Sequence, residues 1–243
     1  MTFNDSLTPD WPAPANVHAL STTRNGGVST PPYASLNLGD HVGDDPQAVA
    51  RNRALLRQQL PAGPLWLKQV HTTVVATADT ATGIPEADAS VARSHNKVCA
   101  VLTADCLPLL LCDRQGTVVA AAHAGWRGLA EGVIEATVKA MHADPADLLA
   151  WLGPAIGPDA FEVGDEVRAI FLAADDAAAN AFTPHGDGKW LADLYLLARL
   201  RLSRCGVGHV SGGEHCTFRE ENRFFSYRRD QTTGRMASLI WLS

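Results

Sequence analysis

The sequence lacks the hydrophobic segments of a membrane or exported protein. The first 20 residues have neither a basic start nor an apolar core, and the longest apolar stretch, residues 99–112, is interrupted by Asp105 and is too short to cross a bilayer. We therefore expect a cytoplasmic protein without a membrane partner. An excess of positive charge is also missing, since the net charge is -6, so the chain has no overall attraction for nucleic acid.

Cysteine is sparse and irregularly spaced. The five cysteines form no C-x-x-C pair, and no H-E-x-x-H motif occurs. An odd number of cysteines in a chain of 243 residues, which is long enough to bury a hydrophobic core, indicates free thiols in a reducing compartment. Any special cysteine would then act as a metal ligand or a nucleophile.

No internal repeat, heptad pattern or low-complexity linker divides the chain. We predict an N-terminal arm at residues 1–16 and one mixed α/β domain at residues 17–243. Apolar and β-branched runs predict strands at 17–24, 65–71, 73–78, 98–105, 107–113, 117–123, 148–153, 224–229 and 237–242. Apolar residues at helical spacing predict helices at 46–60, 128–142, 165–182 and 192–205.

Three potential metal ligands lie where predicted strands end. His71 closes LWLKQVH, Cys106 follows CAVLTAD, and His123 closes TVVAAAH. Functional groups are commonly exposed at strand ends in α/β proteins, so these three side chains could converge. Taken one by one, such residues are more often a hydrogen-bonding histidine or a small buried thiol, and their spacing alone does not identify a metal site.

The sequence around these residues is more informative. The segments TTRNGGVS, SLNLGDHVGDD, KQVH, TADCLP, HAGWRG, LGPAIGP, SYRRD and TGR together resemble the YfiH-like family, also called the laccase-domain or peptidoglycan editing factor family, from about Val17 onward. The resemblance implies that His71, Cys106 and His123 bind a metal ion. It also implies an α/β fold with mixed sheets packed between helical layers, in a topology similar to that of cysteine hydrolases.

A set of two histidines and one cysteine is typical of a catalytic metal ion. Structural zinc normally has four protein ligands, whereas catalytic zinc has three and keeps one position for water or substrate. Zinc is the expected ion, and copper is the other ion that such a set accommodates. Cys112 would lie at the far end of the strand predicted at 107–113, so we expect it to be a core thiol and not a fourth ligand.

Charged residues near the three candidates suggest further roles. Asp105 is either a turn residue or a group that holds a metal ligand or transfers a proton. Arg127 lies at the start of a predicted helix and could meet a phosphate there. We predict a substrate contact for Arg24 and for at least one of Arg228 and Arg229; a surface salt bridge is the alternative for each arginine.

The family resemblance implies phosphorolysis of adenosine, inosine and methylthioadenosine, with adenosine deamination as a second activity. The expected partners are small molecules, a purine nucleoside and phosphate. The H-x-E and P-C-x-x-C signature of cytidine-deaminase-type enzymes is absent, so deamination would use another arrangement. The oligomeric state is left open.

Three alternatives remain at this point, and a fourth, a multicopper oxidase, is disfavoured. The first is an amidase, since the family is also associated with removing a wrong amino acid from a UDP-muramoyl precursor of peptidoglycan. The second is a metal-free hydrolase that uses Cys106 as nucleophile with His123 as base. The laccase name implies a multicopper oxidase, but the nine histidines are dispersed and form no H-x-H pair. A zinc-stabilised interaction module without activity would instead have four protein ligands and no pocket.

Overall fold

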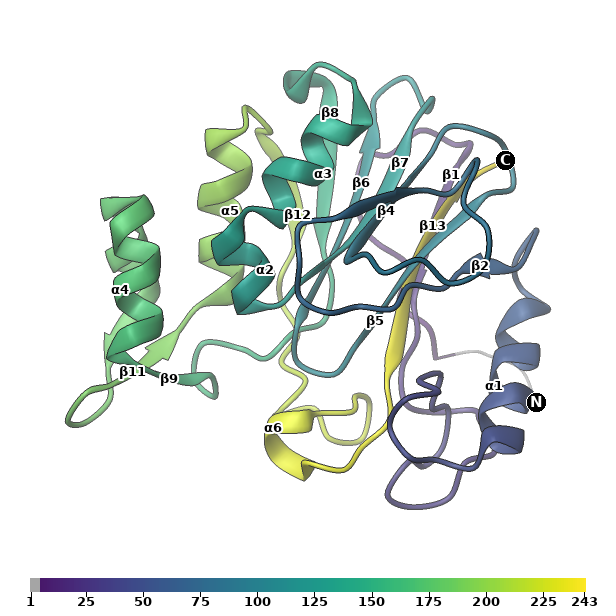
Figure 1. The fold of residues 1–243 in the computed structure, drawn as a ribbon, viewed down its shortest axis with the longest axis horizontal. Helices are drawn as coiled ribbons and strands as arrows, with labels where there is room; N and C mark the ends of the chain where they lie inside the picture. The colour runs from purple at the N-terminus through teal and green to yellow at the C-terminus, as the bar shows by residue number, and fades with distance from the viewer. Residues whose placement is uncertain (1–4) are drawn as a thin grey trace.

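The computed structural model describes residues 5–243, which form three β-sheets flanked by helices (Figure 1). The four-stranded sheet has the order β1-β13-β5-β2, with β1 at Val17–Ser21, β13 at Met236–Leu242, β5 at Val98–Thr103 and β2 at Pro64–Leu65. The six-stranded sheet has the order β12-β8-β6-β7-β4-β3, with β12 at His209–Gly212, β8 at Leu148–Leu152, β6 at Leu107–Asp113, β7 at Val119–Ala124, β4 at Ala89–Ala92 and β3 at Val75–Thr77. A small sheet contains β10 at Phe182–Pro184, β11 at Lys189–Ala192 and β9 at Glu162–Gly164. Each of the two larger sheets combines parallel and antiparallel pairs.

The helices lie outside the sheets. They are α1 at Pro46–Arg57, α2 at Trp126–Glu131, α3 at Val133–Met141, α4 at Asp165–Ala174, α5 at Leu194–Arg204 and α6 at Tyr227–Asp230, with 3-10 helices η1 at Pro145–Asp147 and η2 at Asp176–Ala181. In Figure 1, α1 lies on one side of the sheets, and α2, α3 and α5 lie on the other. Within residues 5–243, no helix is both long and apolar enough to cross a bilayer.

The two larger sheets pack face to face, and both faces of their central strands are buried. In β5, Cys99 and Val101 face the core between the sheets, whereas Ala100 and Leu102 belong to the core beneath α1. The strands β6 and β7 alternate in the same way between the inter-sheet core and the core beneath α3 and α5. The predicted architecture, an α/β domain with mixed sheets between helical layers, is therefore confirmed.

The strand predicted at 65–71 is wrong beyond Leu65. The side-chain amide of Gln69 donates to the Leu102 carbonyl (2.8 Å) and accepts from the Leu102 N–H (2.7 Å), and the Val70 N–H donates to the carboxylate of Asp88 (3.1 Å). Lys68 forms an isolated bridge with Glu86, and these side-chain hydrogen bonds hold the rest of the segment in place of a continuous strand ladder.

The strand predicted at 224–229 is also wrong, since its second half is the short helix α6. The Ser226 hydroxyl accepts a hydrogen bond from the Arg229 N–H (3.2 Å), as a helix N-cap does, and the Arg228 N–H donates to Asp105 (2.6 Å). The apolar signal came from Phe224 and Phe225, which are fully buried.

Two of the predicted helices are interrupted in the structure. The segment 128–142 is divided between α2 and α3 by Gly132, which adopts a left-handed conformation (φ 103°). The segment 165–182 is divided between α4 and η2 at Asp175.

The described part of the predicted N-terminal arm contacts the sheets at two places. Leu7 pairs with Ser21 of β1, and Trp11 packs against the inter-sheet core. Residues 1–4 lie outside the described part of the chain.

Candidate metal centre and its cavity

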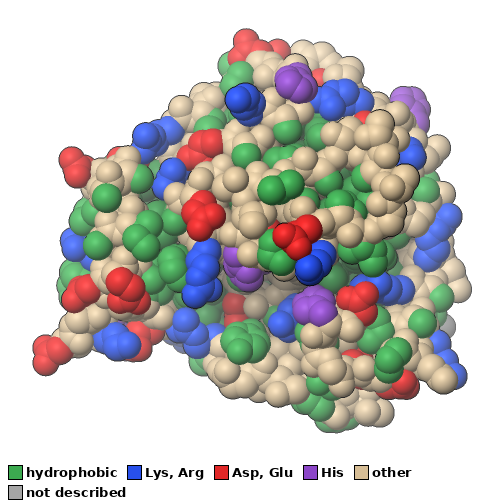
Figure 2. All heavy atoms as spheres, in the orientation of Figure 1, with side chains coloured by type: hydrophobic (Ala, Val, Ile, Leu, Met, Phe, Trp, Pro, Cys, Tyr) green, Lys and Arg blue, Asp and Glu red, His purple; other side chains and the backbone are tan. Residues whose placement is uncertain are grey.

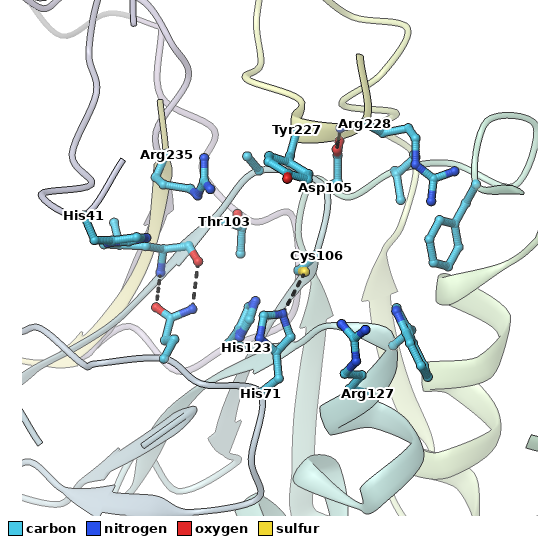
Figure 3. A pocket seen from close by; sticks show the side chains of 16 residues that line it. His41, His71, Thr103, Asp105, Cys106, His123, Arg127, Tyr227, Arg228 and Arg235 are labelled. Carbon is cyan, nitrogen blue, oxygen red and sulfur yellow. Dashed lines mark hydrogen bonds between the residues drawn. The ribbon is translucent and has the colours of Figure 1, made fainter. Parts of the chain in front are cut away.

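The structure brings His71, Cys106 and His123 together at one end of the two large sheets (Figure 3). Their potential ligand atoms all lie within 4.8 Å of one another, and the Cys106 Sγ atom is 3.8 Å from the His71 Nε2 atom. The two imidazole rings meet edge to face with centroids 4.8 Å apart. Among residues 5–243, this is the one group of three or more His, Cys, Asp or Glu side chains with metal-binding geometry.

Strand pairing explains two of the three positions. His123 lies near the end of β7 and follows the alternation by which Val119 and Ala121 face the inter-sheet core, so its ring points toward the four-stranded sheet. Cys106 directly precedes β6, whose first residue Leu107 pairs with Ala124 of β7. The antiparallel pairing of β6 with β7 therefore places Cys106 beside His123.

His71 reaches the group from a loop and not from a strand end. Its φ is 64°, a left-handed conformation that non-glycine residues adopt uncommonly. The Gln69 side chain bonds to Leu102 of β5, and the Thr72 N–H donates to Asp88 (2.7 Å). These hydrogen bonds hold the loop on either side of His71. The expectation that all three candidates end apolar strands is thus correct for Cys106 and His123 but not for His71.

Sequence reasoning missed Asp88, whose carboxylate contacts both His123 and the loop that carries His71. The residue is fully buried, and its Oδ1 atom lies 2.8 Å from the Nδ1 atom of His123. Its Oδ2 atom accepts from the Thr72 N–H (2.7 Å), the Thr72 hydroxyl (3.1 Å) and the Val70 N–H (3.1 Å). The available signal was a carboxylate immediately before a short apolar strand, ASVA, which is common in turns and therefore uninformative by itself.

The charges of these groups support one another. Burial opposes ionisation of Cys106, but the positive charge and hydrogen bonding of His123, together with His71, outweigh it and lower the thiol pKa to about 6. Burial likewise disfavours charged His123, yet Cys106 and Asp88 raise its pKa to about 9. Burial would raise the pKa of Asp88, but hydrogen bonds from His123, Thr72 and Val70 lower it to about 2. These shifts favour the thiolate form of Cys106, the imidazolium form of His123 and the carboxylate form of Asp88.

The three side chains fit a zinc ion. A thiolate and imidazole nitrogens are preferred zinc ligands, and tetrahedral zinc would separate a ligating sulfur and nitrogen by about 3.5 Å. The Cys106 to His71 separation of 3.8 Å is close to that value. The core thiols differ, because burial raises the pKa of Cys99 and of Cys112 to about 12 and both lie in the inter-sheet core. Cys112 is thus a core residue, as expected.

Gly125 leaves room for two of the proposed ligands. A Cβ atom added at Gly125 would lie 2.9 Å from the Cys106 Sγ atom and 2.9 Å from the His71 Cδ2 atom. Its backbone (φ -61°, ψ 157°) suits any residue, so a larger side chain is excluded here by contact and not by backbone conformation.

Replacing Gly125 with Ala is expected to lower zinc affinity by about 10- to 100-fold, the range found when the groups that orient metal ligands are disturbed. The added methyl group would push Cys106 and His71 apart while leaving the fold in place. Competition with a chromogenic chelator measures the affinity. Gly208→Ala is the matched control, because no described heavy atom lies within 4 Å of its added Cβ atom. Equal zinc affinity in the two variants would contradict the assignment of the centre.

The centre forms one wall of a cavity of about 520 Å³. Figure 2, drawn in the orientation of Figure 1, shows a hollow near the middle of the visible face, with histidine and basic side chains around it. Trp126, Ile156 and Phe161 supply apolar surface, and His41 and Tyr227 line the side nearer to α6 and the loop before α1. A cavity of this size and mixed lining suits a small molecule such as a nucleoside.

Three arginines line the cavity, and two predicted ones do not. Arg127 and Arg228 do so as expected, and sequence reasoning missed Arg235, although it belongs to the TGR segment. The Arg228 Nη1 atom donates to the Glu162 carbonyl (2.9 Å), and its guanidinium lies over the Phe161 ring. Figure 3 places Arg127 and Arg235 on different sides of Cys106.

Arg24 and Arg229 lie outside this cavity, beside a separate surface depression. The Arg24 guanidinium donates to the Ala34 carbonyl (2.9 Å) and the Glu221 carbonyl (3.0 Å). Arg229 donates to the carbonyls of Thr217, Phe218 and Phe224 and to the carboxylate of Asp230. These bonds tie neighbouring loops together, and the substrate contacts predicted for Arg24 and for one of the pair Arg228 and Arg229 stay predictions.

Asp105 lines the cavity, but other residues occupy its carboxylate. It accepts hydrogen bonds from the Thr217 hydroxyl (2.6 Å), the Ser226 hydroxyl (3.0 Å) and the Arg228 N–H (2.6 Å). Its own backbone is left-handed (φ 89°). These contacts agree with the first role considered, a turn residue, whose carboxylate here also ties neighbouring loops together; a role in proton transfer stays a prediction.

Comparison with known proteins identifies the family. A family model described as multi-copper polyphenol oxidoreductase laccase matches residues 18–243. Purine nucleoside phosphorylase YfiH of Escherichia coli (strain K12) is 57% identical over 242 residues, covering 97% of this chain and 98% of the relative. Purine nucleoside phosphorylase PA4543 of Pseudomonas aeruginosa is 57% identical over 241 residues, covering 99% of each. The chain belongs to the YfiH-like family.

Solved structures agree with this YfiH-like assignment. The crystal structure of Neisseria meningitidis protein NMB0706 is 59% identical and gives a TM-score of 0.95, covering 99% of this chain and 100% of that one. The crystal structure of YlmD from Geobacillus stearothermophilus is 32% identical and gives a TM-score of 0.86, covering 100% and 97%. Although the family description is multi-copper, the described residues of this YfiH-like protein form one three-residue group that could hold a metal ion.

Proposed function

We propose that this YfiH-like protein is a zinc-dependent purine nucleoside phosphorylase that accepts adenosine, inosine and methylthioadenosine and deaminates adenosine as a second activity. One observation carries the proposal: a single cavity has a His, Cys, His metal group on one wall and three arginines around it. Relatives that are 57% identical over nearly the whole chain are named purine nucleoside phosphorylases, which supports the reaction class.

In phosphorolysis, some residues of the cavity would bind phosphate and others would enclose the nucleoside. A phosphate oxygen must bond to the ribose C1′ atom while the bond from C1′ to the base nitrogen breaks, giving the base and ribose 1-phosphate. Arg127, Arg228 and Arg235 would hold the phosphate dianion, because guanidinium groups pair with phosphate oxygens through charge-assisted hydrogen bonds. Trp126 and Phe161 would shield the nucleoside from water.

His71, Cys106 and His123 would hold the zinc ion. When bound, zinc polarises a substrate oxygen and lowers the pKa of a coordinated water, which would also suit deamination. The thiolate of Cys106 supplies the one negative charge among the three ligands. Asp88 keeps His123 in position, and Gly125 keeps the space between Cys106 and His71 open.

Metal removal and phosphate dependence test this proposal. Protein loaded with one equivalent of zinc is expected to convert adenosine to adenine and ribose 1-phosphate only when phosphate is present, and chelator treatment should abolish the reaction until zinc is returned. Chromatography of the products measures both. Release of an amino acid from a UDP-muramoyl substrate, with no turnover of adenosine, would instead favour the amidase hypothesis.

A cysteine hydrolase is the second candidate, and the Asp88, His123 and Cys106 constellation favours it. A carboxylate that orients a histidine beside a low-pKa thiol is the arrangement of cysteine nucleophiles. The two candidates differ in their response to treatment. Activity that survives chelation but disappears on alkylation of Cys106 would establish the hydrolase and refute the zinc enzyme.

A further inference from the structure

We propose that Asp88 is the positioning residue of the metal centre and that one carboxylate sets the orientation of two of the three metal ligands. This inference rests on the metal centre of the proposed function. It concerns how the chain prepares the site before an ion arrives, and it assigns to Asp88 a role that its neighbours on β4 do not share.

The first carboxylate oxygen orients His123. The Oδ1 atom of Asp88 lies 2.8 Å from the Nδ1 atom of His123, and the His123 N–H donates to the Asp88 carbonyl (2.7 Å). An ionised carboxylate can only accept, so Nδ1 must carry the hydrogen. A metal ion that displaces the proton of the other ring nitrogen, Nε2, would then meet its lone pair, as the tautomer of a ligating histidine requires.

The second oxygen holds the loop on both sides of His71. The Oδ2 atom accepts from the Val70 N–H on one side and from the Thr72 N–H and hydroxyl on the other. His71 itself has the left-handed φ of 64°, a conformation that persists only where surrounding contacts determine it. These three hydrogen bonds provide that determination, and they leave the His71 ring facing Cys106.

The location of Asp88 makes the arrangement rigid. It is fully buried and directly precedes β4, whose neighbour in the sheet is β7, the strand that carries His123. Its N–H donates to the Val74 carbonyl (3.1 Å), so its backbone is also fixed. A buried carboxylate is tolerated only when its oxygens are satisfied, and here each donor belongs to a metal ligand or to the loop that carries one.

An amide of the same shape would break this arrangement. In Asp88→Asn, the side-chain oxygen can face the three donors beside His71 only if the NH₂ group faces Nδ1 of His123. His123 would then carry its hydrogen on Nε2, the nitrogen needed for the metal. Zinc affinity of Asp88→Asn is therefore expected to fall by about 10- to 100-fold. Competition with a chromogenic chelator, on protein stripped of metal, provides the measurement.

Asp113→Asn is the matched control. Asp113 is also buried, and its carboxylate accepts from the Thr117 N–H, the Thr117 hydroxyl and the Val118 N–H, all within its own turn. This variant is expected to lose thermal stability but to keep the zinc affinity of the wild type. A second readout is the visible spectrum of the cobalt-loaded protein, which reports ligand geometry and which general destabilisation would not alter. We expect an altered spectrum for Asp88→Asn alone.

The outcomes separate this inference from the proposed function. If the wild type fails to bind zinc, the metal centre itself is refuted. If the wild type binds zinc and Asp88→Asn binds it equally well with an unchanged cobalt spectrum, the role of Asp88 is refuted. Should Asp88→Asn fail to fold, Asp88→Ser is the replacement: its single hydroxyl cannot reach both His123 and the loop around His71, and it is expected to lose at least tenfold in zinc affinity.

Discussion

Replacing Cys106 with alanine is expected to lower kcat/KM for adenosine phosphorolysis by roughly 10³-fold, since a catalytic metal ion supplies several kcal/mol of transition-state stabilisation. The change removes one of three donor atoms and the only anionic one in the group. Two histidines alone would leave zinc weakly held at neutral pH. Zinc content after dialysis and steady-state kinetics, with zinc in excess and without it, measure the two consequences separately.

Cys106→Asp distinguishes a ligand from a nucleophile. A carboxylate can ligate zinc but cannot take the place of a thiolate in covalent catalysis. We expect this variant to bind zinc and to retain part of the activity that Cys106→Ala loses. Cys205→Ala is the control, because Cys205 is a partly exposed thiol at the end of α5, outside the metal group, and should leave both measurements unchanged. An active Cys106→Ala protein would refute the assigned centre.

Replacing Arg235 with glutamine is expected to raise the KM for phosphate by about 10- to 100-fold, since a hydrogen bond to a charged group contributes about 1.5–3 kcal/mol. Its Nη1 atom donates to the carbonyls of Thr233 and Gly234 (both 3.0 Å), which fixes the plane of the guanidinium at the cavity wall. Burial lowers its pKa, but an arginine remains charged at neutral pH. No carboxylate among the described residues forms a salt bridge with it, so its charge is available to an anion.

This prediction is specific because the KM values for the two substrates should respond differently. The KM for adenosine should change much less than the KM for phosphate, and arsenate, which has the shape and charge of phosphate, should show the same loss. Arg219→Gln is the control: Arg219 is exposed, and its ion pair is with Asp159 on the surface. An unchanged phosphate KM in Arg235→Gln would move the anion site to Arg127 and Arg228.

The hydrophobic pattern predicted the central strands well because both faces of these strands are buried. The strands expected at 98–105, 107–113, 117–123, 148–153 and 237–242 all form, with β7 and β13 extending one residue beyond the predicted bounds. The prediction failed at 65–71 and 224–229, where Gln69, Asp88 and Asp105 take up backbone hydrogen bonds. Such contacts join segments far apart in the chain, so no local pattern of apolar residues reveals them.

The sequence by itself determined the α/β class, the order of the main elements and, through its motifs, the candidates His71, Cys106 and His123. Only the tertiary structure decided which charged residues accompany them. Asp88 reaches His123 across 35 positions of the chain, and Arg235 reaches the cavity from the segment before β13, whereas Arg24 is turned away to bind backbone carbonyls. The physical reason is that strand register and loop packing place these side chains, and both depend on contacts between segments distant in sequence.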